Sequence, residues 1–215
     1  MTRIHTREDI IKAYHDAFRI HGDSPSAVLW PKGRQDLRFR ALVQHVSIES
    51  PCSILDYGCG LGHLKDYLQT HGYQARYLGA DIAQEFVAAA TQKYPDASFS
   101  LIKGNGDVGI DVDHVVASGT FNIVEGDRDT YWNSVKEILA RLFRHCRTSL
   151  AVNFMTDQVD FVQESSFHVA PSSVIEFVKH SLSRRYTLDH SYLPYEFTVV
   201  AYKEQRILRP GNTYL

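Results

Sequence analysis

The spacing of apolar residues predicts two helices at the start of the chain. The first begins after Thr6, which is placed to act as an N-cap, and ends near Gly22, because apolar residues between them recur at the three- and four-residue intervals of one helix face. The second carries its apolar residues between Leu37 and Val46, after a loop rich in serine, proline and glycine. Both helices precede the first predicted strand.

From residue 53 onward, short apolar runs alternate with helical patterns. The predicted strands cover residues 53–57, 75–81, 97–103, 114–118, 149–155, 186–192 and 197–203, and the predicted helices cover 63–71, 83–94, 131–145 and 172–184. This alternation indicates an α/β fold with a seven-stranded, mostly parallel, doubly wound sheet. The last two strands are close enough in sequence to form an antiparallel pair.

The composition supports one soluble globular domain over residues 1–215. Hydrophobic residues make up 44% and charged residues 22% of the chain, as is typical of proteins that fold. The 23 Lys and Arg residues nearly balance the 25 Asp and Glu residues, so charge gives no reason to expect a nucleic-acid partner. The cysteines lack metal-ligand spacing and a disulfide framework, and no apolar run has the length of a signal peptide or membrane span. We therefore expect a cytoplasmic protein with no metal site.

The most informative segment is DYGCGLG, which runs from Asp56 to Gly62 at the end of the first predicted strand. A strand that leads through glycines into a helix leaves backbone N–H groups facing outward, and glycine lets a ligand approach the backbone closely. These features favour a ligand with an anionic or strongly polar group. The dinucleotide fingerprint Gly-x-Gly-x-x-Gly would require glycine at position 63, where this chain has His63. The sequence therefore argues against a nicotinamide cofactor without excluding it.

Two carboxylates follow, at the ends of the next two predicted strands. Asp81 ends the second strand, where it can accept the hydrogen bonds of a ribose diol or, alternatively, cap the helix that follows. Asp107 follows the third strand in a Gly-Asn-Gly-Asp turn, where it can accept from the amine of an adenine or serve only the turn. Because parallel strands end at one edge of a sheet, both carboxylates are expected near the glycine segment.

Together with Ser-Gly-Thr-Phe-Asn at 118–122 after the fourth strand, these motifs resemble class I S-adenosylmethionine-dependent methyltransferases over about residues 53–203. The resemblance implies that Gly58, Gly60 and Gly62 line the methionine end of the cofactor, with Asp56 holding the turn or the amino group. It also implies that Asp81 holds the ribose and Asp107 the adenine. The remaining cofactor contacts are expected from Ile82 and Ser118.

Residues outside these motifs are candidates to close the site or to contact the acceptor. The helices within residues 1–50 are expected to form a lid over a Rossmann-like core of residues 51–215. In that lid Trp30 would pack over the cofactor and Arg38 would pair with its carboxylate, unless they are a packed tryptophan and a surface arginine. Phe121 and Asn122 are expected to contact the substrate, because they leave the fourth strand at the carboxyl edge of the sheet. His168 is a candidate general base among 11 histidines.

The sequence thus favours transfer of a methyl group from S-adenosylmethionine to a hydroxyl, and less so to an amine. The chain leaves no separate domain for a polymer, so we expect the acceptor to be a small polar molecule or a sugar-like unit. The alternatives are a nicotinamide-dependent oxidoreductase and a cofactor-binding protein without transferase activity.

Overall fold

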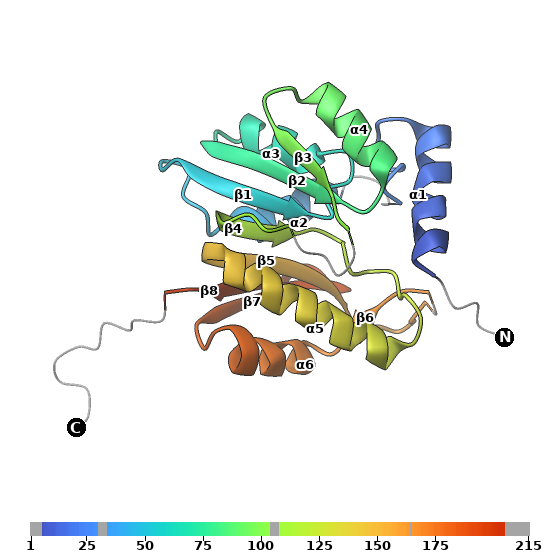
Figure 1. Ribbon diagram of the computed structural model, residues 1–215. Helices are drawn as coiled ribbons and strands as arrows, with labels where there is room; N and C mark the ends of the chain where they lie inside the picture. Colours follow the sequence, from blue (N-terminus) through green and yellow to red (C-terminus); the bar gives the residue numbers. More distant parts are fainter. Residues whose placement is uncertain (1–5, 30–33, 104–107, 164, 205–215) are drawn as a thin grey trace.

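The computed structural model describes residues 6–29, 34–103, 108–163 and 165–204 (Figure 1). Its centre is one sheet, in which seven strands follow the order β3-β2-β1-β4-β5-β8-β7 and the short β6 pairs with β5. The strands are β1 (Cys52–Tyr57), β2 (Ala75–Asp81), β3 (Ser98–Leu101), β4 (Val112–Ala117), β5 (Cys146–Thr156), β6 (His168–Val169), β7 (Tyr186–Leu193) and β8 (Glu196–Tyr202). The strands β1 to β5 run parallel, whereas β8 is antiparallel to β5 and β7. The strand order reverses beside β1, and open α/β sheets bind ligands at such a switch point.

Helices cover both faces of this sheet. They are α1 (Arg7–His21), α2 (Gln35–Val43), α3 (His63–Thr70), α4 (Gln84–Lys93), α5 (Arg128–His145) and α6 (Pro171–Phe177), the last continued by a π-helical turn (Val178–Leu182). α2 and α3 pack on one face around Leu42, Leu64 and Val116. α5 and α6 pack on the other face. The described part of the chain contains no helix that is both long and apolar enough to cross a membrane.

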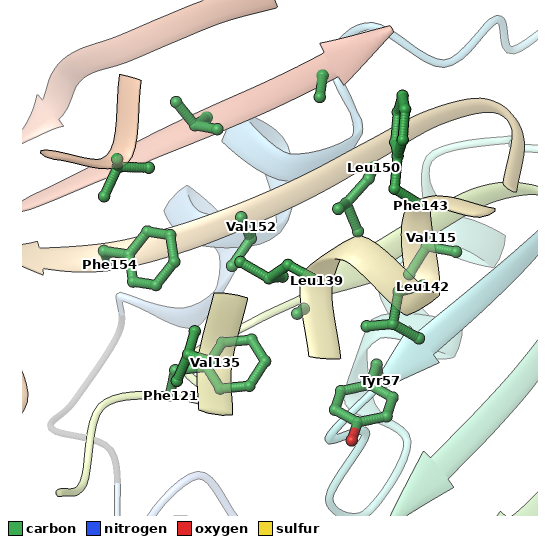
Figure 2. Close-up of a cluster of buried hydrophobic side chains, with 14 of the residues drawn as sticks. Tyr57, Val115, Phe121, Val135, Leu139, Leu142, Phe143, Leu150, Val152 and Phe154 are labelled. Atoms are coloured by element: carbon green, nitrogen blue, oxygen red, sulfur yellow. The ribbon is translucent and has the colours of Figure 1, made fainter. Parts of the chain in front are cut away.

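The larger core lies between α5 and the sheet. Figure 2 shows apolar side chains of α5, among them Leu139, facing Val152 and Phe154 of β5. Phe121, in the loop after β4, stacks on Phe154 and on Tyr57 of β1, with ring centroids 6.3 and 6.2 Å away. These contacts hold the loop after β4 close to the end of β1.

The two helices described within the first 50 residues, α1 and α2, do not form a single lid. Thr6 caps α1 as predicted, because its Oγ1 accepts a hydrogen bond from the Asp9 N–H at 3.2 Å. α1 lies beside the carboxyl ends of the strands (Figure 1), where Tyr14 and Phe18 pack edge-on against Phe86 of α4, with centroids 5.7 Å apart. α2 packs instead against one face of the sheet, where Leu42 is buried. The expected lid is therefore wrong for α2, because its apolar side is occupied by the sheet.

The expected class of fold, with its antiparallel strand pair at the end, is confirmed. Several element bounds differ by up to three residues: α5 begins at Arg128 and not at 131, and β5 begins at Cys146 and not at 149. Two further differences concern the elements themselves. β6 was not predicted, because a strand of two residues is too short to show a period in the sequence. The single helix expected over 172–184 is observed as α6 followed by the π-helical turn, which ends at Leu182.

Candidate functional site

A cavity of about 640 Å³ lies at the carboxyl ends of β1, β2 and β4, a volume usual for ligand-binding clefts. Gly58 and Gly60 line it from the loop between β1 and α3, and Asp81 and Ile82 from the end of β2. Residues 118–121 line it from the loop after β4, and α1 and α5 supply further walls. The cavity therefore sits where the reversed strand order predicts a ligand site.

Asp81 connects the loop of residues 58–62 between β1 and α3, here called the glycine loop, to the start of α4. Its Oδ2 accepts a hydrogen bond from the Gly60 N–H and its Oδ1 accepts one from the Ala83 N–H, both at 2.8 Å. Burial raises the pKa of this carboxyl, while the two N–H donors oppose that rise. A carboxylate oxygen can accept a second hydrogen bond, and Asp81 also lines the cavity. Asp81 can therefore hold the start of α4 and accept a hydrogen bond from a ligand at the same time.

The glycine loop and the loop after β4 interlock. Gly58 has φ +78°, and a Cβ placed there would lie 2.5 Å from the side chain of Thr120. The Thr120 hydroxyl in turn donates a hydrogen bond to the Tyr57 carbonyl oxygen at 2.7 Å. Glycine at position 58 is thus required by the left-handed backbone and by the close approach of the second loop.

Tyrosine and arginine side chains line the rest of the cavity. Tyr14 and Arg7 come from α1, Tyr57 from β1, and Tyr131 and Arg141 from α5. Burial raises the pKa of Tyr57 to about 12, although the two guanidinium charges lower it, and burial also raises the pKa of Tyr14 and Tyr131. The three phenols are therefore neutral near pH 7 and can donate hydrogen bonds. The Nε of Arg141 is buried without a hydrogen-bond partner among the described residues.

The structure brings six of the predicted site residues together. Gly58, Gly60, Asp81, Ile82, Ser118 and Phe121 all line the cavity. Trp30 and Asp107 lie outside the described residues. Among the described residues, the predicted positions that do not line the cavity are Arg38, Asp56, Gly62, Asn122 and His168.

Three of these residues are engaged elsewhere. Arg38 donates through its Nε to both carboxylate oxygens of Glu196, at 2.7 and 2.6 Å, so its expected pairing with a cofactor carboxylate is not observed. Asp56 accepts a hydrogen bond from the Tyr77 hydroxyl at 2.6 Å, and burial raises its pKa to about 7. Gly62 begins α3 against the ring of Tyr94, where a Cβ would lie 2.9 Å from the nearest ring carbon. Each of these residues is therefore held by the protein itself in this structure.

Asn122 and His168 belong to two segments that pair beside the cavity. The Phe167 N–H donates a hydrogen bond to the Asn122 carbonyl oxygen at 2.8 Å. Both polar atoms of the Asn122 amide are buried without hydrogen-bond partners in the described structure. His168 Nδ1 lies 2.7 Å from the Thr156 carbonyl oxygen, which can only accept, so Nδ1 is the donor in this hydrogen bond. Its Nε2 is also buried and without a partner in the described parts of the chain.

Sequence reasoning missed the contribution of α1 and α5. Arg7 and Tyr14 line the cavity together with Ile10, one helical turn apart on the same side of α1. The helical spacing of Ile10 and Tyr14 was visible in the sequence, but it does not distinguish a core-facing side from one that faces a cavity. The same limit applies to Tyr131 of α5.

Comparisons with known proteins indicate the family to which the chain belongs. A profile of the methyltransferase domain family matches residues 55–147. A Mycobacterium tuberculosis protein that bears the name of a methyltransferase, Rv1506c, is 30% identical over 161 residues, which make up 74% of this chain and 97% of that protein. Trans-aconitate 2-methyltransferase of Yersinia pestis is 36% identical over 58 residues, which make up 27% of this chain and 22% of that protein.

Solved structures share the fold. Magnesium protoporphyrin IX methyltransferase from Synechocystis PCC 6803, determined with bound SAH, has a TM-score of 0.64 and 16% identity, over 92% of this chain and 98% of that one. A TehB-like SAM-dependent methyltransferase from Corynebacterium glutamicum has a TM-score of 0.56 and 14% identity, over 90% of this chain and 98% of that one. The chain belongs to the class I S-adenosylmethionine-dependent methyltransferases, which confirms the class expected from its motifs.

Proposed function

We propose that this methyltransferase binds S-adenosylmethionine in the cavity and methylates an oxygen of a small polar molecule or sugar-like unit. The observation that carries the proposal is the single cavity that joins the glycine loop and Asp81 to a region lined by Tyr14, Tyr131 and Ser134. The first part suits a nucleoside with an amino-acid end, and the second adds hydroxyl groups that can orient a polar acceptor.

The residues at the first part fit the cofactor chemically. Asp81 presents carboxylate lone pairs at the end of β2, where ribose hydroxyls can donate to them. Ile82 and Ile102 supply an apolar wall suited to a base ring, and Gly58 and Ser118 bring backbone close to the cavity. When bound, S-adenosylmethionine supplies a methyl group on a positively charged sulfur. Asp107 remains a proposed adenine contact.

Transfer to a hydroxyl requires alignment and the removal of one proton. The acceptor oxygen forms a bond to the methyl carbon as the carbon–sulfur bond breaks, and the hydroxyl proton leaves to a base or to water. We propose His168 as that base, because its Nδ1 is engaged by the Thr156 carbonyl oxygen, its Nε2 has no partner among the described residues, and the preceding Phe167 pairs with Asn122 beside the cavity. His168 does not line the cavity, so this role requires its side chain to turn toward the acceptor. Phe121 and Asn122 are proposed to contact the acceptor, Phe121 from the cavity wall and Asn122 through its unbonded amide.

A small acceptor is also supported by the Yersinia relative, whose name gives trans-aconitate as its substrate. The matched 58 residues cover only a short part of that protein, so we carry over the size and polarity of the acceptor and not its identity.

Incubation with isotopically methyl-labelled S-adenosylmethionine and a fractionated metabolite extract tests the proposal. We expect label in a small polar product whose methyl group is attached to oxygen, identified by mass spectrometry and NMR. Label on nitrogen, or label found only in protein or nucleic acid, would contradict it. His168→Gln should lower the turnover of the identified acceptor while leaving cofactor binding intact, whereas His71→Gln, at the exposed residue that follows α3, serves as the control.

A further inference from the structure

A buried polar network runs from α2 to the cavity wall. Arg38, Glu196 and Asn153 have at most 2% of their surface exposed, although all three carry polar or charged groups. They come from α2, the first residue of β8 and the middle of β5. Buried charges are costly unless they are paired and hydrogen-bonded, so such a cluster needs a physical reason.

Glu196 is the centre of the network. Both of its carboxylate oxygens accept from the Arg38 Nε, and its Oε1 also accepts from the Asn153 Nδ2 at 2.5 Å and from the Tyr192 hydroxyl at 3.1 Å. A carboxylate only accepts, so it forces the Asn153 amide to turn its NH2 toward Glu196. The amide oxygen of Asn153 must then point the opposite way.

That oxygen reaches the cavity wall. Asn153 Oδ1 accepts a hydrogen bond from the Gly119 N–H at 2.7 Å, and Gly119 lines the cavity between Ser118 and Thr120. Thr120 is the residue that interlocks with Gly58. The orientation of the buried Asn153 amide thus fixes the backbone of the loop after β4. Because Thr120 of that loop packs against Gly58, the same amide also influences the position of the glycine loop.

We propose that Glu196 is a positioning residue for cofactor binding, which acts through Asn153 to hold Gly119 and the wall of residues 118–121 in place. The inference rests on the proposed assignment of this cavity to the cofactor. Burial and pairing alone would not require charges, because well-packed apolar side chains often stabilise a core as well as a buried ion pair does. A purely structural network would therefore tolerate apolar replacement, whereas a positioning network would not.

The decisive variant replaces both charges, Arg38→Met together with Glu196→Leu. It leaves no uncompensated charge, so it is expected to fold, and it frees the Asn153 amide to turn. We expect backbone amide exchange across residues 118–122, followed by mass spectrometry without ligand, to accelerate by about tenfold, and the affinity for S-adenosylmethionine in calorimetry to fall by about tenfold. Asn153→Leu, which removes the acceptor of the Gly119 N–H, should give the same two changes.

The matched control is Asp113→Asn, which disturbs a polar cluster at the opposite edge of the sheet, where Asp113 bonds to Ser53 and Arg147. It should change neither the exchange of residues 118–122 nor cofactor affinity. Unchanged exchange, or cofactor affinity within about twofold of wild type in a folded double variant, would overturn the proposal. If the wild-type protein does not bind S-adenosylmethionine, the cavity assignment fails instead, and the exchange measurement still decides whether Glu196 holds the loop.

Discussion

The two edges of the sheet use polar groups differently: the cluster at the amino ends of the strands is partly exposed, whereas Asp81 at their carboxyl ends is buried. At the amino edge, Asp113 accepts hydrogen bonds from the N–H and hydroxyl of Ser53, at 2.8 and 2.7 Å, and from the Nε of Arg147 at 2.9 Å. At the carboxyl edge, Asp81 accepts from two backbone N–H groups and also faces the cavity. At the amino edge, the residues of the cluster form hydrogen bonds with one another. At the carboxyl edge, Asp81 forms hydrogen bonds that position the loops around the cavity.

We therefore expect substitutions at the two edges to affect different properties, stability alone at the amino edge and ligand binding as well at the carboxyl edge. A change at the amino edge removes interactions within the protein and should alter only its free energy of unfolding. The same change at the carboxyl edge should also alter the cavity, so paired substitutions at the two edges test where the ligand lies.

The largest contrast is expected between Gly58→Ala and Gly72→Ala. Both glycines have φ +78°, so alanine costs about 1 kcal/mol of backbone strain at either position. At Gly72 the new Cβ would lie 3.9 Å from Ile48, but at Gly58 it would overlap Thr120. We expect Gly58→Ala to weaken cofactor binding by about a hundredfold or more, and Gly72→Ala to leave it within about twofold, as measured by calorimetry. A folded Gly58→Ala variant with wild-type affinity would remove this loop from the site.

A smaller contrast is expected between Asp81→Asn and Asp113→Asn. The first places an amide NH2 against a backbone N–H and removes charge-assisted hydrogen bonds to the ribose, each contributing about 1.5–3 kcal/mol. We expect cofactor affinity to fall by about thirtyfold for Asp81→Asn and to stay unchanged for Asp113→Asn, while chemical denaturation shows a loss of stability in both. If the Asp81 variant loses stability alone, the carboxylate serves only the start of α4.

The smallest effects concern pH, where two buried groups act in opposite directions. Burial, reinforced by the nearby His114, lowers the pKa of His45 to about 4, so its contribution to stability is full above about pH 6.5 and is lost as the pH falls toward 4. Burial raises the pKa of Asp56 to about 7, so its contribution is full below about pH 4 and is lost as the pH rises through 7.

The contributions of these two groups therefore change in opposite directions between pH 4 and 7. Compared with the wild-type protein, His45→Gln should lose more stability as the pH rises from 4 to 7, because the Asp56 contribution is left unopposed, and Asp56→Asn should gain more stability over the same range. Parallel slopes in the two variants would show that one of the groups is not titrating as its burial implies.

Much of the fold was predictable because its signals are local. The glycines after β1, the carboxylate of Asp81 and the alternation of strands and helices each leave a pattern in a short segment. The bounds of β2 were predicted to the residue, since Asp81 ends both the apolar run and the strand.

The rest depended on contacts between distant segments. Nothing near Arg38 in the sequence indicates Glu196, which lies 158 residues away, and without that partner an arginine before the first strand looked available to a ligand. The Asn153 to Gly119 hydrogen bond also joins two elements that only the sheet brings together. Likewise, the apolar residues of α1 and α2 did not indicate that the first helix faces the cavity and the second faces the sheet.

The central claim is that the carboxyl-edge cavity is a site for S-adenosylmethionine. Calorimetric titration of the purified protein with S-adenosylmethionine, its demethylated product and NAD tests this claim directly, with Asp81→Asn measured alongside. We expect the first two ligands to bind at one site per chain, NAD to give no measurable heat, and the variant to bind the first two more weakly. Binding of NAD without S-adenosylmethionine, or equal affinity of S-adenosylmethionine for the wild-type and Asp81→Asn proteins, would contradict it.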